Sequence, residues 1–206
     1  MLTPILLITG GYLLGSVACA VMVCRALGLP DPRSGGSGNP GATNVLRLHG
    51  KLAAVLTLAG DVLKGLIPVL MAQALDAAHW VVALTGMAAF AGHIFPVYFG
   101  FRGGKGVATL VGVLLGIHWA LGAAFVGTWL LMAALFRYSS LAALTAAALT
   151  PVYAWLLLRE LIYVFALCSL AAALIWRHGA NIRQLLSGKE EKLQLGSKSP
   201  VSGQRG

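Results

Sequence analysis

Two short segments of this sequence combine glycines with hydrogen-bond donors and a cation. The first is Ser37-Gly-Asn-Pro-Gly-Ala-Thr-Asn44, with Arg47 close behind it, and the second is Gly103-Gly-Lys-Gly106. Glycines let a backbone approach an anion, and hydroxyl, amide, ammonium and guanidinium groups can donate hydrogen bonds to it. A helix beginning near Val107 would add its N-terminal amides to the second segment. Phosphate binding is one interpretation of both segments. The other is a turn-rich loop for the first and a positively charged membrane anchor for the second.

Two further polar segments, Arg137-Tyr-Ser-Ser140 and Arg177-His-x-x-Asn181, separate apolar runs later in the chain. His178 and Asn181 are three residues apart, so a continuing helix would place them on one face. Each segment alone is explained by anchoring at the membrane surface, with Arg177 favourably placed at a helix C-terminus. A role in chemistry depends on whether the four segments meet.

Several catalytic patterns are absent from the sequence, and this narrows the chemistry. The six acidic residues include no pair, in the apolar runs or the basic loops, with the spacing of a metal site. No histidine is followed five positions later by aspartate, and there is no G-x-S-x-G motif. Lys105 is followed by glycine, so the second segment is not a Walker A loop. We therefore expect a reaction without a metal, another cofactor or a protein nucleophile.

The composition indicates an integral membrane protein. Of 206 residues, 58% are hydrophobic and 10% charged, and the mean hydropathy is +0.84. A soluble domain has roughly a quarter of its residues charged, so most of this exterior must face lipid. The net charge of +9 allows nucleic acid, anionic lipid or an anionic substrate as partner. Because the basic residues flank apolar runs, we expect membrane lipid and an anionic substrate and no nucleic acid.

The apolar runs predict an all-α, polytopic transmembrane helix bundle with seven spans. Val107–Ile117 is short, and it could instead pair with the run after it as a re-entrant element, which leaves five spans. Charged residues inside the predicted spans are few: Asp61 and Lys64, three apart, are expected to form an ion pair within the bundle. The predicted spans are Pro4–Cys24, Leu52–Leu75, Trp80–Phe99, Val107–Ile117, Ala120–Phe136, Ser140–Leu158 and Leu161–Trp176.

The distribution of Lys and Arg predicts the orientation. With the N-terminus outside, thirteen of these residues fall on the inner side, and only Arg159 falls outside, while Lys64 lies within a span. This asymmetry is the positive-inside pattern, so the C-terminus is predicted to be cytoplasmic. Residues 1–186 are expected to form one transmembrane domain, and residues 187–206 a basic, disordered cytoplasmic tail.

Taken together, these segments resemble the bacterial acyl-phosphate-dependent glycerol-3-phosphate acyltransferase family, integral membrane enzymes of phospholipid synthesis. The matching stretches follow the family's order over nearly the whole chain. One departure is Val17-Ala18, where many relatives have a proline after the Gly-Ser of the first span. The stretches are Gly10–Ser16, Ser37–Asn44, Asp61–Gly65, Gly92–Pro96, Gly100–Thr109, Tyr138–Leu141 and Arg177–Ile182.

The resemblance implies transfer of a fatty acyl group from acyl phosphate to glycerol 3-phosphate, which gives 1-acyl-glycerol 3-phosphate (lysophosphatidate) and phosphate. It implies a site at the cytoplasmic face of the bacterial inner membrane and transient contact with a soluble acyl-phosphate synthase. An organic-anion or phosphate transporter is the rival hypothesis, but it predicts paired repeats and polar groups at the midplane. The sequence has no visible repeat, and its polar residues gather at one face.

With this resemblance, each candidate residue can be given an expected role. Because both substrates carry phosphate, positioning and charge stabilisation can suffice for the reaction. The hydroxyl proton is expected to pass either to His178 or to the donor's own phosphate. One phosphate is expected to be bound by Gly103, Gly104, Lys105, Gly106, Ser139 and Ser140. The other is expected to be bound by Asn39, Thr43, Asn44 and Arg47. Nearest the reacting hydroxyl and carbonyl we expect Ser37, His178 and Asn181.

Overall fold

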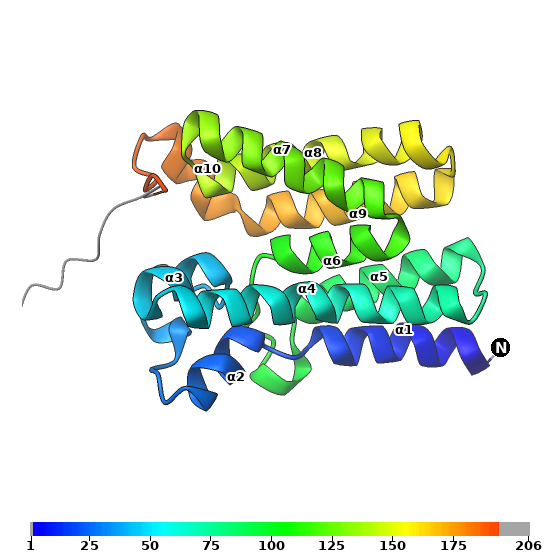
Figure 1. The fold of residues 1–206 in the computed structure, drawn as a ribbon, viewed down its shortest axis with the longest axis horizontal. Helices are drawn as coiled ribbons and strands as arrows, with labels where there is room; N and C mark the ends of the chain where they lie inside the picture. Colours follow the sequence, from blue (N-terminus) through cyan, green and yellow to red (C-terminus); the bar gives the residue numbers. More distant parts are fainter. Residues whose placement is uncertain (1, 194–206) are drawn as a thin grey trace, which may run out of the picture.

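The computed structural model describes residues 2–193, and its regular secondary structure is entirely helical (Figure 1). The expected all-α fold is confirmed. Residues 194–206, which make up most of the predicted tail, lie outside the described residues. The elements are α1 (Leu2–Gly15), α2 (Cys19–Ala26), η1 (Pro32–Ser34), α3 (Ala42–His49), α4 (Lys51–Ala74), α5 (His79–Ile94), η2 (Val97–Phe99), α6 (Val107–Ile117), α7 (Trp119–Phe136), α8 (Ser139–Leu158), α9 (Leu161–Arg177) and α10 (Gly179–Leu186).

Helices α1 and α4 to α9 run lengthwise through the molecule, and α2, α3 and α10 lie at the end opposite the N-terminus (Figure 1). Among residues 2–193, four helices are long and apolar enough to cross a membrane, and six spans result if each of two bent helix pairs counts as one. The pairs are α1 with α2, bent by 48°, and α9 with α10, bent by 61°. The chain is therefore a polytopic helical membrane bundle with four to six candidate spans.

Glycines bring two helix pairs into close contact. A Cβ on Gly15 or Gly92 would overlap the backbone of the partner helix in the α1–α5 pair. In the α4–α6 pair, Gly65 faces the carbonyl of Thr109 and Gly112 faces that of Val62, again without room for a Cβ. Small residues let helix backbones approach in lipid, where hydrophobic association is weak. These contacts hold α5 and α6, which flank the second glycine segment, against α1 and α4.

The predicted first span, Pro4–Cys24, is broken into two helices, which together still form one candidate span. Helix α1 ends at Gly15, and α2 begins at Cys19. The carbonyl oxygen of Val17 accepts a hydrogen bond of 2.7 Å from Lys64 Nζ. A side chain that takes a backbone carbonyl can replace a helical hydrogen bond and bend the chain. The break thus occurs at Val17-Ala18 without a proline, because α4 supplies the donor.

Helix α6 is too short to cross a bilayer alone. Its 11 residues correspond to about 16 Å, against a hydrocarbon core of about 30 Å. It nevertheless runs beside α4. The turn that connects it to α7 lies toward the end of the bundle that holds the N-terminus (Figure 1). The glycine segment before α6 is therefore recessed into the bundle from the opposite end.

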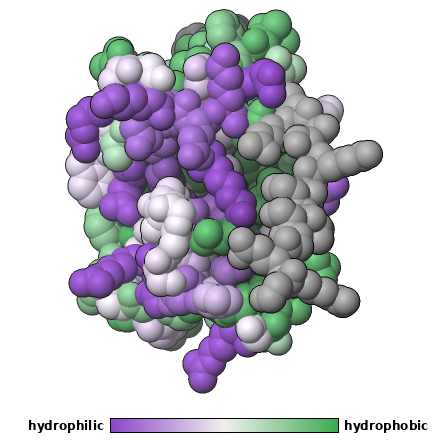
Figure 2. Space-filling model, turned by 90° about the vertical axis from the view of Figure 1, so that its left-hand side faces the viewer, coloured by the Kyte–Doolittle hydropathy of each residue, from purple (hydrophilic) through white to green (hydrophobic). Residues whose placement is uncertain are grey.

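Polar and charged side chains gather at this opposite end. The view onto it shows a broad hydrophilic area, bordered by apolar surface (Figure 2). It carries the segment before α3, the segment before α6, the α7–α8 turn and α10 (Figure 1). The sides of the bundle expose large apolar residues, among them Leu130, Leu156 and Phe165. This distribution fits a bundle whose sides contact lipid and whose polar end faces water.

We predict that cysteines introduced at the exposed positions Ser37 and Arg102 will react with a membrane-impermeant maleimide from one face only. These positions lie in the segments before α3 and before α6, which are at the polar end (Figure 1). A cysteine at Ala78, in the turn at the other end of the bundle, serves as the matched control and should react from the other face. The exposed Cys168 is replaced by alanine throughout. In intact cells only the Ala78→Cys variant should be labelled. Labelling of Ser37→Cys or Arg102→Cys from outside would reverse the predicted orientation.

Candidate functional site

The second glycine segment rests on the C-terminal turn of α5. The Gly104 amide donates a hydrogen bond of 3.2 Å to the His93 carbonyl. A Cβ on Gly103 would overlap the carbonyl oxygens of His93 and Ile94. Gly106 has a φ of 90°, in the left-handed region that favours glycine. These positions require glycine because the backbone passes so close to α5.

Arg177, the last residue of α9, holds the same segment from another side. Its Nη2 donates to the Gly103 carbonyl at 3.0 Å, and its Nε donates to the Gly104 carbonyl at 3.2 Å. Sequence reasoning treated Arg177 as an anchor at a helix end and left it out of the site. The Gly104 amide, expected to bind a phosphate, is bonded to α5 in this structure. The amide of Gly103, Lys105, Gly106 and the N-terminus of α6 remain as expected donors.

Four side chains form one hydrogen-bonded chain next to this segment. Lys105 Nζ donates to Asn181 Oδ1 at 2.6 Å. Asn181 Nδ2 donates to both Glu190 carboxylate oxygens, at 2.9 and 3.1 Å. Ser140 Oγ donates to Glu190 Oε1 at 2.7 Å. The carboxylate therefore fixes which way the Asn181 amide faces, and with it the position of the Lys105 ammonium.

The segment after α10 closes over these groups. The Leu193 amide donates to the Arg137 carbonyl, and Glu191 Oε2 pairs with Arg47 Nη1 at 3.2 Å. Residues 187–193, expected to belong to a disordered tail, thus make defined contacts with the α7–α8 turn and with α3. Sequence reasoning missed Glu190 and Glu191, because nothing in a polar C-terminal stretch showed that it folds back.

Charge at this end is strongly positive and partly buried. Burial lowers the pKa of the Lys105 ammonium from its usual value, Glu190 opposes this effect, and the Arg177 and Arg47 guanidinium groups reinforce it. Three cations thus converge from three separate segments, and two carboxylates from the C-terminal segment partly neutralise them. Such a cluster favours an anionic ligand.

His178 lies at the bend between α9 and α10, and it is 3% exposed. Its Nδ1 lies 2.8 Å from the Leu174 carbonyl, which can only accept, so Nδ1 carries the proton and Nε2 is the free acceptor. Burial lowers its pKa to about 4, which keeps the ring neutral near pH 7. His178 precedes α10 as its N-cap, and the Ile182 amide donates to the His178 carbonyl at 2.9 Å, so His178 and Asn181 lie on one helical turn. The bend turns Asn181 toward Lys105 and His178 back toward α9.

The first polar segment is organised by Asn44, which is 2% exposed. Its Oδ1 accepts from the Ser37 amide at 3.0 Å, and its Nδ2 donates to the Pro32 and Gly35 carbonyls at 2.9 and 3.2 Å. These bonds give Asn44 a structural role in its loop, and its expected contact with substrate stays a prediction. The side chains of Ser37 and Thr43 are exposed.

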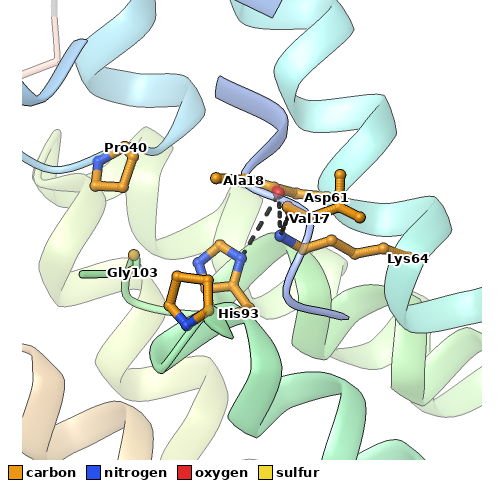
Figure 3. A pocket seen from close by; sticks show the side chains of 9 residues that line it. Val17, Ala18, Pro40, Asp61, Lys64, His93 and Gly103 are labelled. Atoms are coloured by element: carbon orange, nitrogen blue, oxygen red, sulfur yellow. Dashed lines mark hydrogen bonds and ion pairs between the residues drawn. The ribbon is translucent and has the colours of Figure 1, made fainter. Parts of the chain in front are cut away.

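The structure brings together Lys105, Ser140, Asn181 and, through Glu191, Arg47. Ser139 begins α8 beside Ser140, and its side chain is half-buried. Asn39 is half-buried in its own loop. Among residues 2–193, no hydrogen bond joins Ser37, Asn39 or Thr43 to the Lys105 group. Pro40, in the same loop, lines a small cavity that Gly103 and Gly104 also line (Figure 3).

Comparison with known proteins agrees with this arrangement. The profile of the family described as glycerol-3-phosphate acyltransferase matches residues 5–188. A glycerol-3-phosphate acyltransferase of Thioalkalivibrio sulfidiphilus is 61% identical over 94% of this chain and 95% of its own length. That of Methylococcus capsulatus is 56% identical over 91% of this chain and 95% of its own.

The chain belongs to the glycerol-3-phosphate acyltransferase family.

The same conclusion comes from solved structures. One is the crystal structure of PlsY (YgiH), an integral membrane glycerol 3-phosphate acyltransferase, in its glycerol 3-phosphate form. It superposes on this chain with a TM-score of 0.89 and is 37% identical in sequence. The match covers 93% of this chain and 96% of the PlsY chain. The lysophosphatidic acid form of PlsY gives a TM-score of 0.87 at 36% identity. The resemblance inferred from the sequence is confirmed, and this glycerol-3-phosphate acyltransferase is an integral membrane enzyme of phospholipid synthesis.

The pKa of His178 predicts a specific dependence of stability on pH. In the unfolded chain the imidazole has its usual pKa near 6.5, above the folded value of about 4. Between these values the unfolded state binds more protons, so stability decreases as pH falls from about 6.5 to 4. His178→Asn keeps a donor near the Leu174 carbonyl and removes the titration. Thermal unfolding in detergent at pH 4.5 and 7.5 should show a larger loss of Tm for the wild type than for the variant. Equal losses would contradict the buried neutral imidazole.

Proposed function

We propose that this acyltransferase takes its acyl group from an acyl phosphate and transfers it to glycerol 3-phosphate, giving lysophosphatidate and phosphate. The related PlsY has been crystallised with glycerol 3-phosphate and with lysophosphatidic acid. The observation that carries the proposal is the convergence of Lys105, Arg177 and Arg47 on one recessed site with hydroxyl and amide donors. Two phosphate-bearing substrates need several separate cations and donors, and this site offers them.

The donors divide into two groups that fit two phosphates. One group comprises the Lys105 ammonium, the amides of Gly103 and of the residues from Lys105 to the first turn of α6, and the hydroxyls of Ser139 and Ser140. The N-terminus of α6 favours negative charge through its unpaired amides and its dipole. The other group is Arg47 with Asn39 and Thr43, on and before α3. Ser37, His178 and Asn181 are assigned to the reacting hydroxyl and carbonyl, and Asn44 shapes the loop that carries Ser37.

The reaction needs positioning more than activation. The hydroxyl oxygen of glycerol 3-phosphate attacks the acyl carbonyl carbon, and the bond from that carbon to the phosphate oxygen breaks. Phosphate leaves with the electron pair and, at the end of the step, carries the hydroxyl proton. A mixed anhydride has a good leaving group, and the clustered cations stabilise its developing charge.

His178 has the geometry of an acceptor for the hydroxyl. Its Nδ1 is committed to the Leu174 carbonyl, which leaves Nε2 to orient the attacking group. A pKa of about 4 makes the imidazole a weak base, because efficient general bases have pKa values near the working pH. The departing phosphate is therefore the better final proton acceptor. Asn181, fixed by Glu190, keeps Lys105 in place during the transfer.

Orientation and location complete the proposal. The lengthwise helices, including the short α6, make seven passages, with the N-terminus outside and the polar end in the cytoplasm of a bacterial cell. The thirteen inner-side basic residues support this orientation. An acyl phosphate made by a soluble synthase would reach the site from the cytoplasm, through a transient contact at the polar end. Residues 1–186 form the acyltransferase domain, and residues 187–193 fold back over its polar end.

Replacing the two cations tests the phosphate assignment. Lys105→Ala removes the only ammonium in the Gly103–Gly106 segment, and Arg47→Ala removes the guanidinium of α3. Each should reduce kcat/KM by about 10²-fold, because Lys105 acts in a partly desolvated site and the Arg47 guanidinium can make a bidentate contact with a phosphate. Lys51→Ala is the matched control, since Lys51 is an exposed cation at the same end. Near-complete activity of both test variants in folded protein would favour the alternative of membrane anchoring.

The choice of donor can be tested with purified enzyme in detergent. Acyl phosphate should yield lysophosphatidate, whereas acyl-CoA and acyl carrier protein should not replace it, because the predicted site holds a phosphate leaving group. Activity should persist in excess EDTA, since the predicted chemistry uses no metal. A strict requirement for magnesium, or equal rates with acyl-CoA, would overturn this part of the proposal.

A further inference from the structure

A network of buried polar side chains lies beneath the glycine segment. Asp61, Lys64, His93 and Thr109 are each at most 6% exposed. Lys64 Nζ lies 2.8 Å from Asp61 Oδ1, which confirms the expected ion pair, and it also donates to the Val17 carbonyl. The network therefore joins α4, α5, α6 and the break after α1, and Figure 3 shows His93 and Lys64 turned toward the same Asp61 oxygen.

The His93 ring is held along one edge. Its Nδ1 lies 3.0 Å from Thr109 Oγ1 and 3.6 Å from Asp61 Oδ1. Asp61 is in turn fixed by Lys64. A ring with a hydrogen-bonded partner on one helix and a carboxylate on another has little freedom to rotate. His93 thus differs from a histidine that merely ends a helix at the membrane surface.

The opposite edge of the ring supports the glycine segment. A Cβ on Gly104 would overlap His93 Nε2, and the three nearest atoms to such a Cβ all belong to this ring. The His93 carbonyl also accepts the Gly104 amide. For Gly103 the conflict is different, because its Cβ would meet backbone carbonyls and not a side chain. The ring therefore limits how closely the backbone of Gly104, and of Lys105 after it, can approach α5.

We infer that His93 is a positioning residue. Its ring is held by Thr109 and the Asp61–Lys64 pair, and it forms a rigid packing surface (the floor) under the Gly103–Gly106 segment. In this role His93 touches no reacting atom. It fixes the height of the segment from below, while Arg177 holds the Gly103 and Gly104 carbonyls. This role rests on the proposed phosphate site at Lys105.

Two pairs of variants test the floor directly. Gly104→Ala should reduce kcat/KM by about 50-fold or more, because the methyl group pushes the segment off the ring. Adding His93→Ala should remove this extra defect, so that the double variant is no worse than His93→Ala alone. Gly103→Ala is the matched control: its conflict is with backbone, so His93→Ala should not relieve it. Multiplicative defects in the Gly104→Ala/His93→Ala variant, or full activity of Gly104→Ala, would overturn the inference.

The kinetic constants separate positioning from general damage to the fold. Thr109→Val removes the hydroxyl that meets Nδ1, and Thr85→Val is its control. Thr85 is also fully buried on α5, and its hydroxyl has no partner among the described residues. Thr109→Val should raise KM about tenfold for one substrate, with kcat reduced by threefold or less, whereas Thr85→Val should change neither. A fall in kcat with both KM values unchanged would contradict the positioning role, as would an equal rise in both KM values.

Comparison with Lys105→Ala distinguishes this inference from the proposed function. The substrate whose KM rises in Thr109→Val should be the one whose KM rises in Lys105→Ala. If Lys105→Ala changes neither KM nor kcat while Thr109→Val raises one KM, the Lys105 assignment fails and the floor stands, with backbone amides as the phosphate donors. If the two variants affect different substrates, the floor does not serve the Lys105 segment, and the inference is wrong.

Discussion

The two hydrogen bonds from Arg177 to the carbonyls of Gly103 and Gly104 join the last lengthwise helix to the segment before α6. A backbone that leaves a helix inside a bundle must have its polar groups satisfied by the protein, because lipid offers no partner. Arg177 meets this need for the carbonyls, and α5 meets it for the Gly104 amide. With the segment so fixed, the bend after Arg177 places Asn181 against Lys105 and buries His178.

Charge balance explains why the C-terminal segment belongs to the site. Lys105, Arg177 and Arg47 would repel one another across a partly desolvated space. Glu190 lies within this group and orients Asn181, while Glu191 pairs with the exposed guanidinium of Arg47. Because the Glu191 pair is exposed, it contributes little to stability. The better-buried Glu190 is suited to keeping the amide and the ammonium aligned.

The sequence allowed good prediction wherever a local pattern decides structure. Hydropathy marked the apolar helices, and glycine with Lys105 marked the segment that α5 and Arg177 hold in place. Features that depend on a distant side chain could not be read in this way. The break after Gly15 needs Lys64 from α4, and the structural use of Asn44 needs the path of its own loop. The folding back of Glu190 depends on Ser140 and Asn181, which follow no local rule.

The dependence on distant side chains also matters for the proposed acyl transfer, which uses no protein nucleophile. Electrostatic stabilisation is effective when the donors are already in place and do not have to reorganise during the reaction. Lys105 is a flexible side chain on a glycine-rich backbone, so it is rigid only if the groups around it are. Asn181 constrains its ammonium, Arg177 constrains the preceding carbonyls, and the packed ring of His93 limits the backbone from below. Glycine thus gives the segment its close approach to α5, and the neighbouring helices supply the rigidity that glycine itself lacks.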